Sequence, residues 1–198
     1  MKKFELTTEF ITNALGKKLF RIKALVEFGS VKAGELGGYA EKEENISQDG
    51  NAWVSGDARV YGDARVYGDA KVYGDARVSG DARVYGDARV YGDAWVHGDA
   101  WVYGDAKVSG DARVYGDARV YGDADYALVK GFGTEFRCTT FYRDKNKKIM
   151  VNCGCFHGDL EAFRKQVKET RSGKIAKEYL MIADLMEYHF TSEDSSDE

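Results

Sequence analysis

The chain has 198 residues, a net charge of −4 and no proline. This acidic balance does not favour general attraction to nucleic acid or to an anionic membrane, and no apolar run reaches the roughly 20 residues that cross a bilayer. The first residues, Met1-Lys2-Lys3-Phe4-Glu5-Leu6, lack the long apolar segment of a signal peptide. Three cysteines suit a reducing compartment better than a disulfide framework, so a cytoplasmic protein is predicted.

Residues 1–38 are predicted to form a small β-structured N-terminal cap. Residues 4–7 and 19–25 alternate in polarity as half-buried strands do. Ala40 and Ile46 lie six residues apart, which predicts that both point inward in an irregular first coil. An atypical coil is expected at this end, because an open β-helix exposes unpaired strand edges.

Residues 39–125 contain a six-residue repeat whose typical form is Gly-Asp-Ala-Arg-Val-Tyr. Valine recurs at every sixth position from Val54 to Val120, and alanine from Ala52 to Ala124. This period matches neither a helix nor an alternating strand, but it is typical of a β-helix. Valine would enter the core between an outward Arg and an outward Tyr, and Gly-Asp would make the bends. The predicted fold is mainly β, a parallel β-helix with three strands per 18-residue coil.

Two resemblances follow from these residues. Read from valine, the unit Val-Tyr-Gly-Asp-Ala-Arg resembles the hexapeptide-repeat family, whose signature is aliphatic-x-x-x-small-x. That resemblance implies a left-handed coil and a homotrimer formed through the β-helix faces. Residues 20–25, 31–39 and 153–160 look similar to segments of small repeat proteins carried by bacteriophages and prophages. This second resemblance implies a phage-type protein in the cytoplasm of a bacterial host and leaves its activity open.

Residues 126–190 are predicted to form an α+β C-terminal domain. Strands are expected at residues 127–129, 136–142 and 148–153. Asp159 can cap a helix that carries Leu160, Phe163 and Val167 on one face, and a second helix follows Gly173. Residues 191–198 form a short acidic tail for which disorder is predicted.

Residues 18 apart in the repeat are predicted to stack in columns, at about 4.8 Å per step. One such column consists of Tyr67, Tyr85, Tyr103 and Tyr121. Stacked Tyr and Arg side chains either simply cover exposed sheet or form an interface, because interfaces are enriched in aromatic residues and Arg. The second interpretation predicts a homotrimer with the all-tyrosine column at or near the contact.

Two successive units depart from the repeat, with tryptophan in place of Arg or Lys and a histidine in place of Tyr or Ser. Neutral drift at a tolerant surface position is one interpretation. The other is a ligand site in the crevice between subunits, made of Trp95, His97, Trp101, Tyr103, Arg83 and Arg119. There the aromatic rings would stack on a flat ring and an arginine would pair with a phosphate. This favours a small anionic or nucleotide-like ligand, such as a host defence signal, with a host protein as the alternative partner and no cofactor.

The same histidine admits an enzymatic alternative. Hexapeptide-repeat acyltransferases use a histidine general base beside a coenzyme A cleft between subunits, and by that resemblance His97 is a weak catalytic candidate. However, no long loop interrupts residues 50–124 to enclose an acceptor pocket. A non-catalytic, oligomeric binding protein is therefore the main prediction, and a coenzyme A-dependent acyltransferase is the alternative.

A last cluster combines cysteine with histidine. In Cys153-x-Cys155-x-His157, three possible ligands would share one side of an extended strand, and Cys138 could face them from the neighbouring strand. Such a set would suffice for structural zinc. The spacing is not that of a standard finger or ribbon, and free cysteines are commonly small core hydrophobes. Buried thiols without metal are therefore the main prediction, with these four residues as weak metal candidates.

Overall fold

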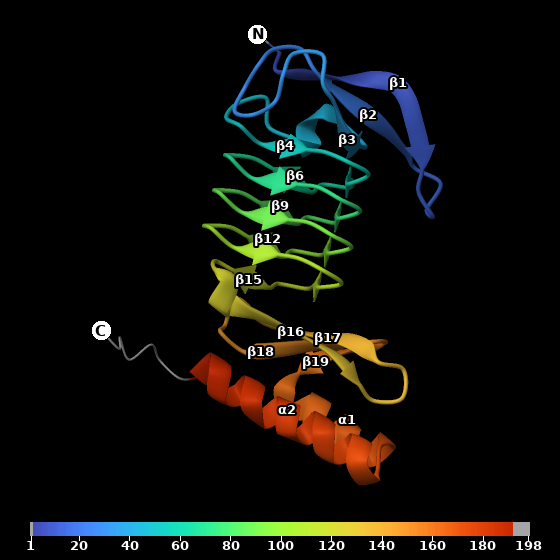
Figure 1. Cartoon of the computed structure of the whole chain (residues 1–198), viewed down its shortest axis with the longest axis vertical. Helices are drawn as coiled ribbons and strands as arrows, with labels where there is room; N and C mark the ends of the chain where they lie inside the picture. Colours follow the sequence, from blue (N-terminus) through green and yellow to red (C-terminus); the bar gives the residue numbers. More distant parts are fainter. Residues whose placement is uncertain (1, 192–198) are drawn as a thin grey trace, which may run out of the picture. The chain divides into compact units, whose positions relative to one another are not determined.

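The computed structural model describes residues 2–191, which divide into two compact units, one up to Asp123 and one from Ala124 onward. Strands β1 to β15 lie in the first unit, and β16 to β19 with helices α1 and α2 lie in the second (Figure 1). Helix α2 ends at Thr191, so the predicted acidic tail does not begin at this residue. Residues 192–198, which make up the rest of that tail, lie outside the described part of the chain.

The first unit opens with an antiparallel hairpin. Strand β1 (Phe4–Thr12) pairs with β2 (Lys18–Ala24), and β2 pairs with β3 (Leu36–Ala40). Strand β3 then runs parallel to β5 (Arg59–Val60). The two strands expected near the N-terminus are thereby confirmed, and they continue one sheet of the repeat region.

A run of two-residue strands follows, each containing one valine of the repeat. These strands are β4 (Trp53–Val54), β5 (Arg59–Val60), β6 (Arg65–Val66), β7 (Lys71–Val72), β8 (Arg77–Val78), β9 (Arg83–Val84), β10 (Arg89–Val90), β11 (Trp95–Val96), β12 (Trp101–Val102), β13 (Lys107–Val108), β14 (Arg113–Val114) and β15 (Arg119–Val120). A short 3-10 turn, η1 (Glu43–Asn45), precedes them, and another, η2 (Asp123–Asp125), follows them.

From β4 to β12, each strand pairs in parallel with the strand 18 residues further along the chain, as Val66 pairs with Val84. The sheet orders in this unit are β1-β2-β3-β5-β8-β11-β14, β13-β10-β7-β4 and β15-β12-β9-β6. Backbone hydrogen bonds join these stacked coils, for example from the Arg65 amide to the Ala82 carbonyl at 2.9 Å. The unit is therefore a parallel β-solenoid, and the β-helix fold class is confirmed at that level.

The core of the solenoid consists of the repeated valines and alanines. From Ala52 to Val120 these side chains have no solvent exposure. The glycines of the bends have positive φ, +69° at Gly80, a conformation that glycine adopts without the steric penalty of a Cβ. The predicted inward positions and glycine bends are both confirmed, as are the inward Ala40 and Ile46.

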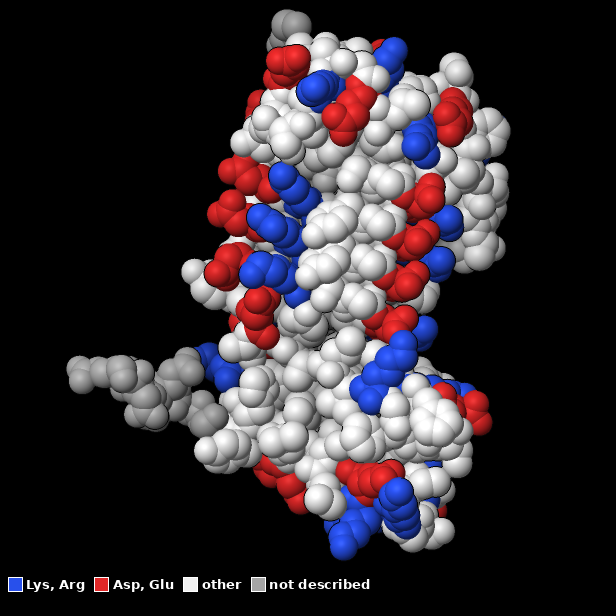
Figure 2. All heavy atoms as spheres, viewed as in Figure 1, with Lys and Arg blue, Asp and Glu red and all other residues white. Residues whose placement is uncertain are grey.

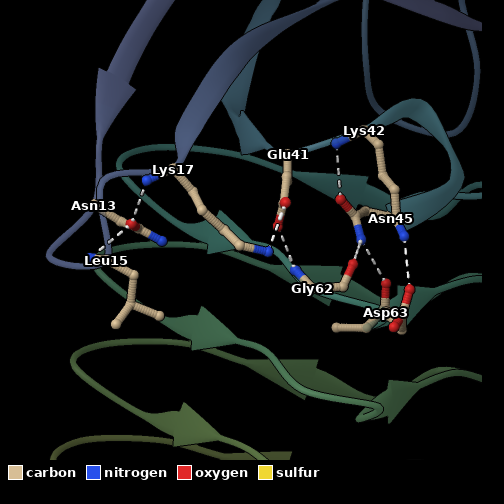
Figure 3. A network of polar contacts seen from close by, with 9 residues as sticks. Asn13, Leu15, Lys17, Glu41, Lys42, Asn45, Gly62 and Asp63 are labelled. Carbon is tan, nitrogen blue, oxygen red and sulfur yellow. Dashed lines mark hydrogen bonds and ion pairs between the residues drawn. The ribbon is translucent and has the colours of Figure 1, made fainter.

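Polar side chains close the N-terminal end of the solenoid, where no preceding strand is available. The Asn45 amide donates to the Gly62 carbonyl at 3.0 Å and to the Ala64 carbonyl at 2.8 Å. The Glu41 carboxylate accepts from the Gly62 amide at 2.7 Å (Figure 3). Because unpaired backbone groups at a sheet edge favour association with another edge, these bonds disfavour stacking of solenoids through this end.

The second unit is a four-stranded antiparallel sheet with two helices. The sheet order is β16 (Tyr126–Phe132), β17 (Arg137–Arg143), β18 (Ile149–Cys153) and β19 (Phe156–Asp159). The helices are α1 (Leu160–Thr170) and α2 (Gly173–Thr191). Asp159 caps α1 by accepting from the Ala162 amide at 2.8 Å, as predicted.

Apolar side chains of both helices pack on this sheet. Phe141 and Val151 of the sheet join Phe163 and Val167 of α1 and Ile182 of α2 in one buried cluster. The α+β fold of this unit and its two helices are confirmed. Strand β19 is an additional strand that was not predicted from the sequence. Within residues 2–191, no helix has both the length and the apolar composition required to span a bilayer.

Candidate functional site

The strands β6, β9, β12 and β15 carry the predicted tyrosine column, and we call their outer surface the tyrosine face. Tyr67 and Tyr85 stack with ring centroids 4.8 Å apart and ring planes 3° apart, and Tyr85 and Tyr103 stack at 5.1 Å and 11°. Tyr121 meets Tyr103 edge-on at 5.2 Å. Figure 2 shows rows of charged side chains beside uncharged ones over the solenoid. Because the stacked rings cover one another, a flat ligand finds no free ring face inside the column.

Trp101 lies in the neighbouring column of the same face, between two arginines. The guanidinium of Arg83 lies 4.9 Å from the indole centroid, and that of Arg119 lies 4.3 Å from it. Arg119 also donates to backbone carbonyls, including that of Ala118 at 2.8 Å. The structure thus brings Arg83, Trp101 and Arg119 together, and cation–π contacts occupy the indole. In the predicted site, by contrast, this indole would stack on the flat ring of a ligand.

Trp95 and His97 lie elsewhere, because β11 belongs to a different sheet from β12. His97 Nδ1 is 2.9 Å from the Ser79 hydroxyl, and its ring meets Tyr115 edge-on. Arg77 lies 5.7 Å from the Trp95 ring. The six residues predicted to form one site are therefore divided within one chain between two faces of the solenoid.

His97 lies on the exposed surface of the solenoid rather than in an enclosed site. Its side chain is exposed, and Ser79 is the hydrogen-bonding side chain found for it among residues 2–191. A general base needs a partner that sets its tautomer and a substrate position within hydrogen-bonding reach. The acyltransferase alternative gains no geometric support from this environment.

The tyrosine column ends at Tyr67, and this end has a different geometry. Ile46 forms a β-bridge with Val66, and the Ser47 amide donates to the Val66 carbonyl at 2.9 Å. Ser47 thereby takes the position next to Tyr67 that a tyrosine occupies in the following coils. Because serine is small, the ring of Tyr67 is stacked by Tyr85 on one side and borders a hollow of about 410 Å³.

We call this space the end hollow. Its lining consists of Glu44, Ser47, Arg65, Val66, Tyr67 and Arg83. Burial raises the pKa of Tyr67, while the nearby positive charges of Arg83 and Arg65 act in the opposite direction. Both guanidinium groups therefore lie close enough to the phenol to influence its charge. The two arginines exceed the Glu44 carboxylate by one positive charge, so the end hollow can accept a flat ring against Tyr67 and an anionic group beside the arginines.

The end hollow was not predicted from the sequence, although the residues before the repeat contain an indication of it. Ser47 and Asn45 stand where the repeat would place Tyr and Arg, just before the regular pattern begins. The prediction of binding residues was based instead on the tryptophans Trp95 and Trp101. Only the pairing of Ile46 with Val66 shows that the irregular segment adds a stacked position to the tyrosine face.

The predicted alignment of Cys153, Cys155 and His157 on one side of an extended strand, on which the zinc alternative depended, is wrong. Cys153 ends β18 and pairs with Phe156 at the start of β19, so Gly154 and Cys155 form a tight turn between two strands. Gly154 has φ +62° and permits this reversal. His157 bonds to the Tyr142 hydroxyl at 3.0 Å, and the described residues contain no cluster of three or more potential metal ligands. The prediction of buried thiols is also wrong, because Cys138 and Cys153 are half-buried and Cys155 is exposed.

The fold and the repeat together define a β-solenoid repeat protein. In agreement, the family model described as "YdcK Beta solenoid repeat" matches residues 58–72, 70–84, 82–98 and 112–124. These matches cover less than half of the chain and lie, apart from Ala124, in the first unit, so they support the repeat class alone. No curated protein matches the chain significantly.

Proposed function

We propose that this protein is a non-catalytic, oligomeric binding protein that holds a small planar anion in the end hollow. The observation that carries this proposal is the ring face of Tyr67 beside Ser47, with Arg65 and Arg83 next to it. A ligand ring would occupy the position that the next tyrosine of the column would fill. Ring stacking on an aromatic side chain contributes about 1–3 kcal/mol, and charge-assisted bonds to the arginines would add to it.

Adenosine 5′-monophosphate is the probe for this site, with uncharged adenosine as its counterpart. We expect calorimetry to show binding of the nucleotide, with an affinity that falls as salt rises, and weaker binding of adenosine. Tyr67→Ala should weaken nucleotide binding about tenfold because the stacking surface is lost. Tyr91→Ala removes a stacked tyrosine from another sheet and should leave binding unchanged. No binding at millimolar nucleotide, or equal binding by both variants, would exclude the end hollow as the site.

We further propose the finer architecture that the hexapeptide resemblance implies. The coil would be left-handed with three strands per 18 residues, and three chains would associate through the tyrosine face. Protein interfaces are enriched in aromatic and Arg side chains, which form the columns of this face. The tyrosine column includes Tyr121, which is 60% exposed. The end hollow lies on the same face, so a neighbouring subunit would border it.

Sedimentation velocity tests the association. We expect a trimer at micromolar concentration, and we expect Tyr85→Glu to dissociate it because three buried carboxylates would lose their hydration at the contact. Tyr91→Glu places the same charge on another sheet and serves as the control. A monomeric wild-type protein would refute the trimer, and dissociation by Tyr91→Glu alone would move the contact to that sheet.

The proposed biological setting is a phage-type accessory protein in the cytoplasm of a bacterial host. Its support is the resemblance of residues 20–25, 31–39 and 153–160 to segments of phage-borne and prophage-borne repeat proteins. In that setting the planar anion would be a nucleotide-like signal of host defence, withdrawn from its receptor by binding. Metabolites that copurify with the protein from infected cells, but not with the Tyr67→Ala variant, would identify it.

A further inference from the structure

The second unit contains a cavity of about 350 Å³ that no sequence pattern indicated. It lies where the ends of the sheet's hairpins approach helix α1 and one side chain of α2. Its lining includes Arg137, Cys153, Phe156, Phe163, Arg171 and Tyr179. The volume is within the range of small-ligand sites.

Aromatic side chains line one part of this cavity. Phe156 and Phe163 lie with ring centroids 5.5 Å apart, and Tyr179 meets Phe163 edge-on at 5.9 Å. Phe163 and Val167 are nearly fully buried and belong to the core of the unit. Because the buried Phe163 fixes Phe156 by packing, the half-buried ring of Phe156 offers a preformed apolar surface for the body of a small ligand.

Two exposed arginines give the cavity its charge. Neither Arg137 nor Arg171 forms an ion pair with another described residue, whereas Arg164 of the same unit pairs with Asp184 at 2.7 Å. Arg137 and Arg171 line the same cavity as the Tyr179 phenol. Burial and the neighbouring Cys153 raise the pKa of Tyr179, and the charges of Arg171 and Arg137 oppose that effect. Glu135 also lines the cavity, so the two guanidinium groups exceed the carboxylate by one positive charge.

We propose that this cavity is a second binding site, specific for a small aromatic anion. The ring of the ligand would lie against Phe156, which Phe163 supports from the core, and its phosphate or carboxylate would lie between Arg137 and Arg171. Planar guanidinium groups bind such anions in a bidentate manner. The proposal concerns the second unit alone and does not depend on ligand binding in the end hollow.

The cysteines of the chain provide a direct test. Cys153 and Cys155 line the cavity, and Cys138 does not. The full-length protein would be alkylated with iodoacetamide in the presence of 1-naphthyl phosphate, and each cysteine would be followed by mass spectrometry. We expect the ligand to slow alkylation of Cys153 and Cys155 at least severalfold and to leave the rate at Cys138 unchanged. Inorganic phosphate and 1-naphthol, which each supply half of the ligand, should protect less.

Two variants separate binding from general effects. Arg171→Gln should weaken 1-naphthyl phosphate binding about tenfold, because one charge-assisted pair is lost. Lys168→Gln removes a positive charge from α1 at a residue that does not line this cavity, and it should bind normally. Thermal unfolding would verify that both variants fold. Absence of protection at millimolar ligand, equal protection of Cys138, or equal affinities of the two variants would overturn the proposal.

Discussion

Replacement of Gly80 by alanine is expected to lower the free energy of unfolding by about 2–4 kcal/mol. Gly80 has φ +69°, and a Cβ at this position would lie 2.9 Å from the backbone nitrogen of Gly98 in the next coil. The left-handed backbone alone costs an L-residue about 1–2 kcal/mol. The close backbone contact adds to that cost, because the stacked bends cannot separate without lengthening the hydrogen bonds between coils.

Gly34 provides the matched control for this substitution. It has φ +86°, but a Cβ there would have no neighbouring atom within 4 Å. Gly34→Ala should therefore lose only the backbone contribution of about 1–2 kcal/mol. Chemical denaturation of the two variants measures the difference. Equal losses of unfolding free energy in the two variants would show that contact with the neighbouring bend adds no cost to a side chain at Gly80.

A second large effect is expected from Lys3, whose ammonium group substitutes for backbone donors at the N-terminal end of the solenoid. Its Nζ donates to the Gly50 carbonyl at 3.2 Å and to the Ala52 carbonyl at 3.0 Å. In the next coil, the carbonyls of Gly68 and Ala70 accept from backbone amides instead. Burial lowers the pKa of Lys3 from 10.5 to about 8, although nearby aspartates oppose the shift.

The sign of the pH dependence follows from this lowered pKa. Between pH 8 and 10.5 the unfolded chain binds more protons at Lys3 than the folded chain does, so stability rises with pH in this window. The contribution grows by up to about 1.4 kcal/mol per pH unit, is complete above pH 10.5 and is lost as the pH falls to 8.

Comparison with Lys3→Met isolates this contribution, because titration of the tyrosines is common to both proteins. We expect the unfolding free energy of the wild type to rise more steeply from pH 8 to 10 than that of Lys3→Met. Lys2→Met alters an exposed lysine paired with Glu43 and should keep the wild-type slope. Parallel pH profiles for wild type and Lys3→Met would contradict the role assigned to Lys3.

The regular parts of the fold were predictable because the same pattern of buried and bend residues recurs many times in the sequence. Valines and alanines equivalent to Val84 and Ala82 recur every six residues, with a glycine bend between units. Each further unit therefore supports the same assignment of buried positions. Asp159 before an amphipathic segment likewise indicated the start of α1. By contrast, the reversal at Gly154 depends on a single residue, and the alternating cysteines around it equally suggest a continuous strand.

Candidate binding residues were harder to predict, since spacing assigns a residue to a face without showing what lies on either side of it. Trp101 was identified together with Arg83 and Arg119, but the sequence does not reveal that both guanidinium groups lie against its ring. Trp95 is one repeat unit away from Trp101 along the chain, but it belongs to another sheet.

By itself, the sequence determined that a parallel β-solenoid forms from the valine and alanine repeat, because burial of those side chains is a local and repeated requirement. Tertiary structure alone decided where free surfaces remain. Ser47 comes to lie beside Tyr67, and Arg137 and Arg171 come to line one cavity, only after strands and helices distant in sequence have packed. Both spaces arise from such long-range contacts, which no period in the chain encodes.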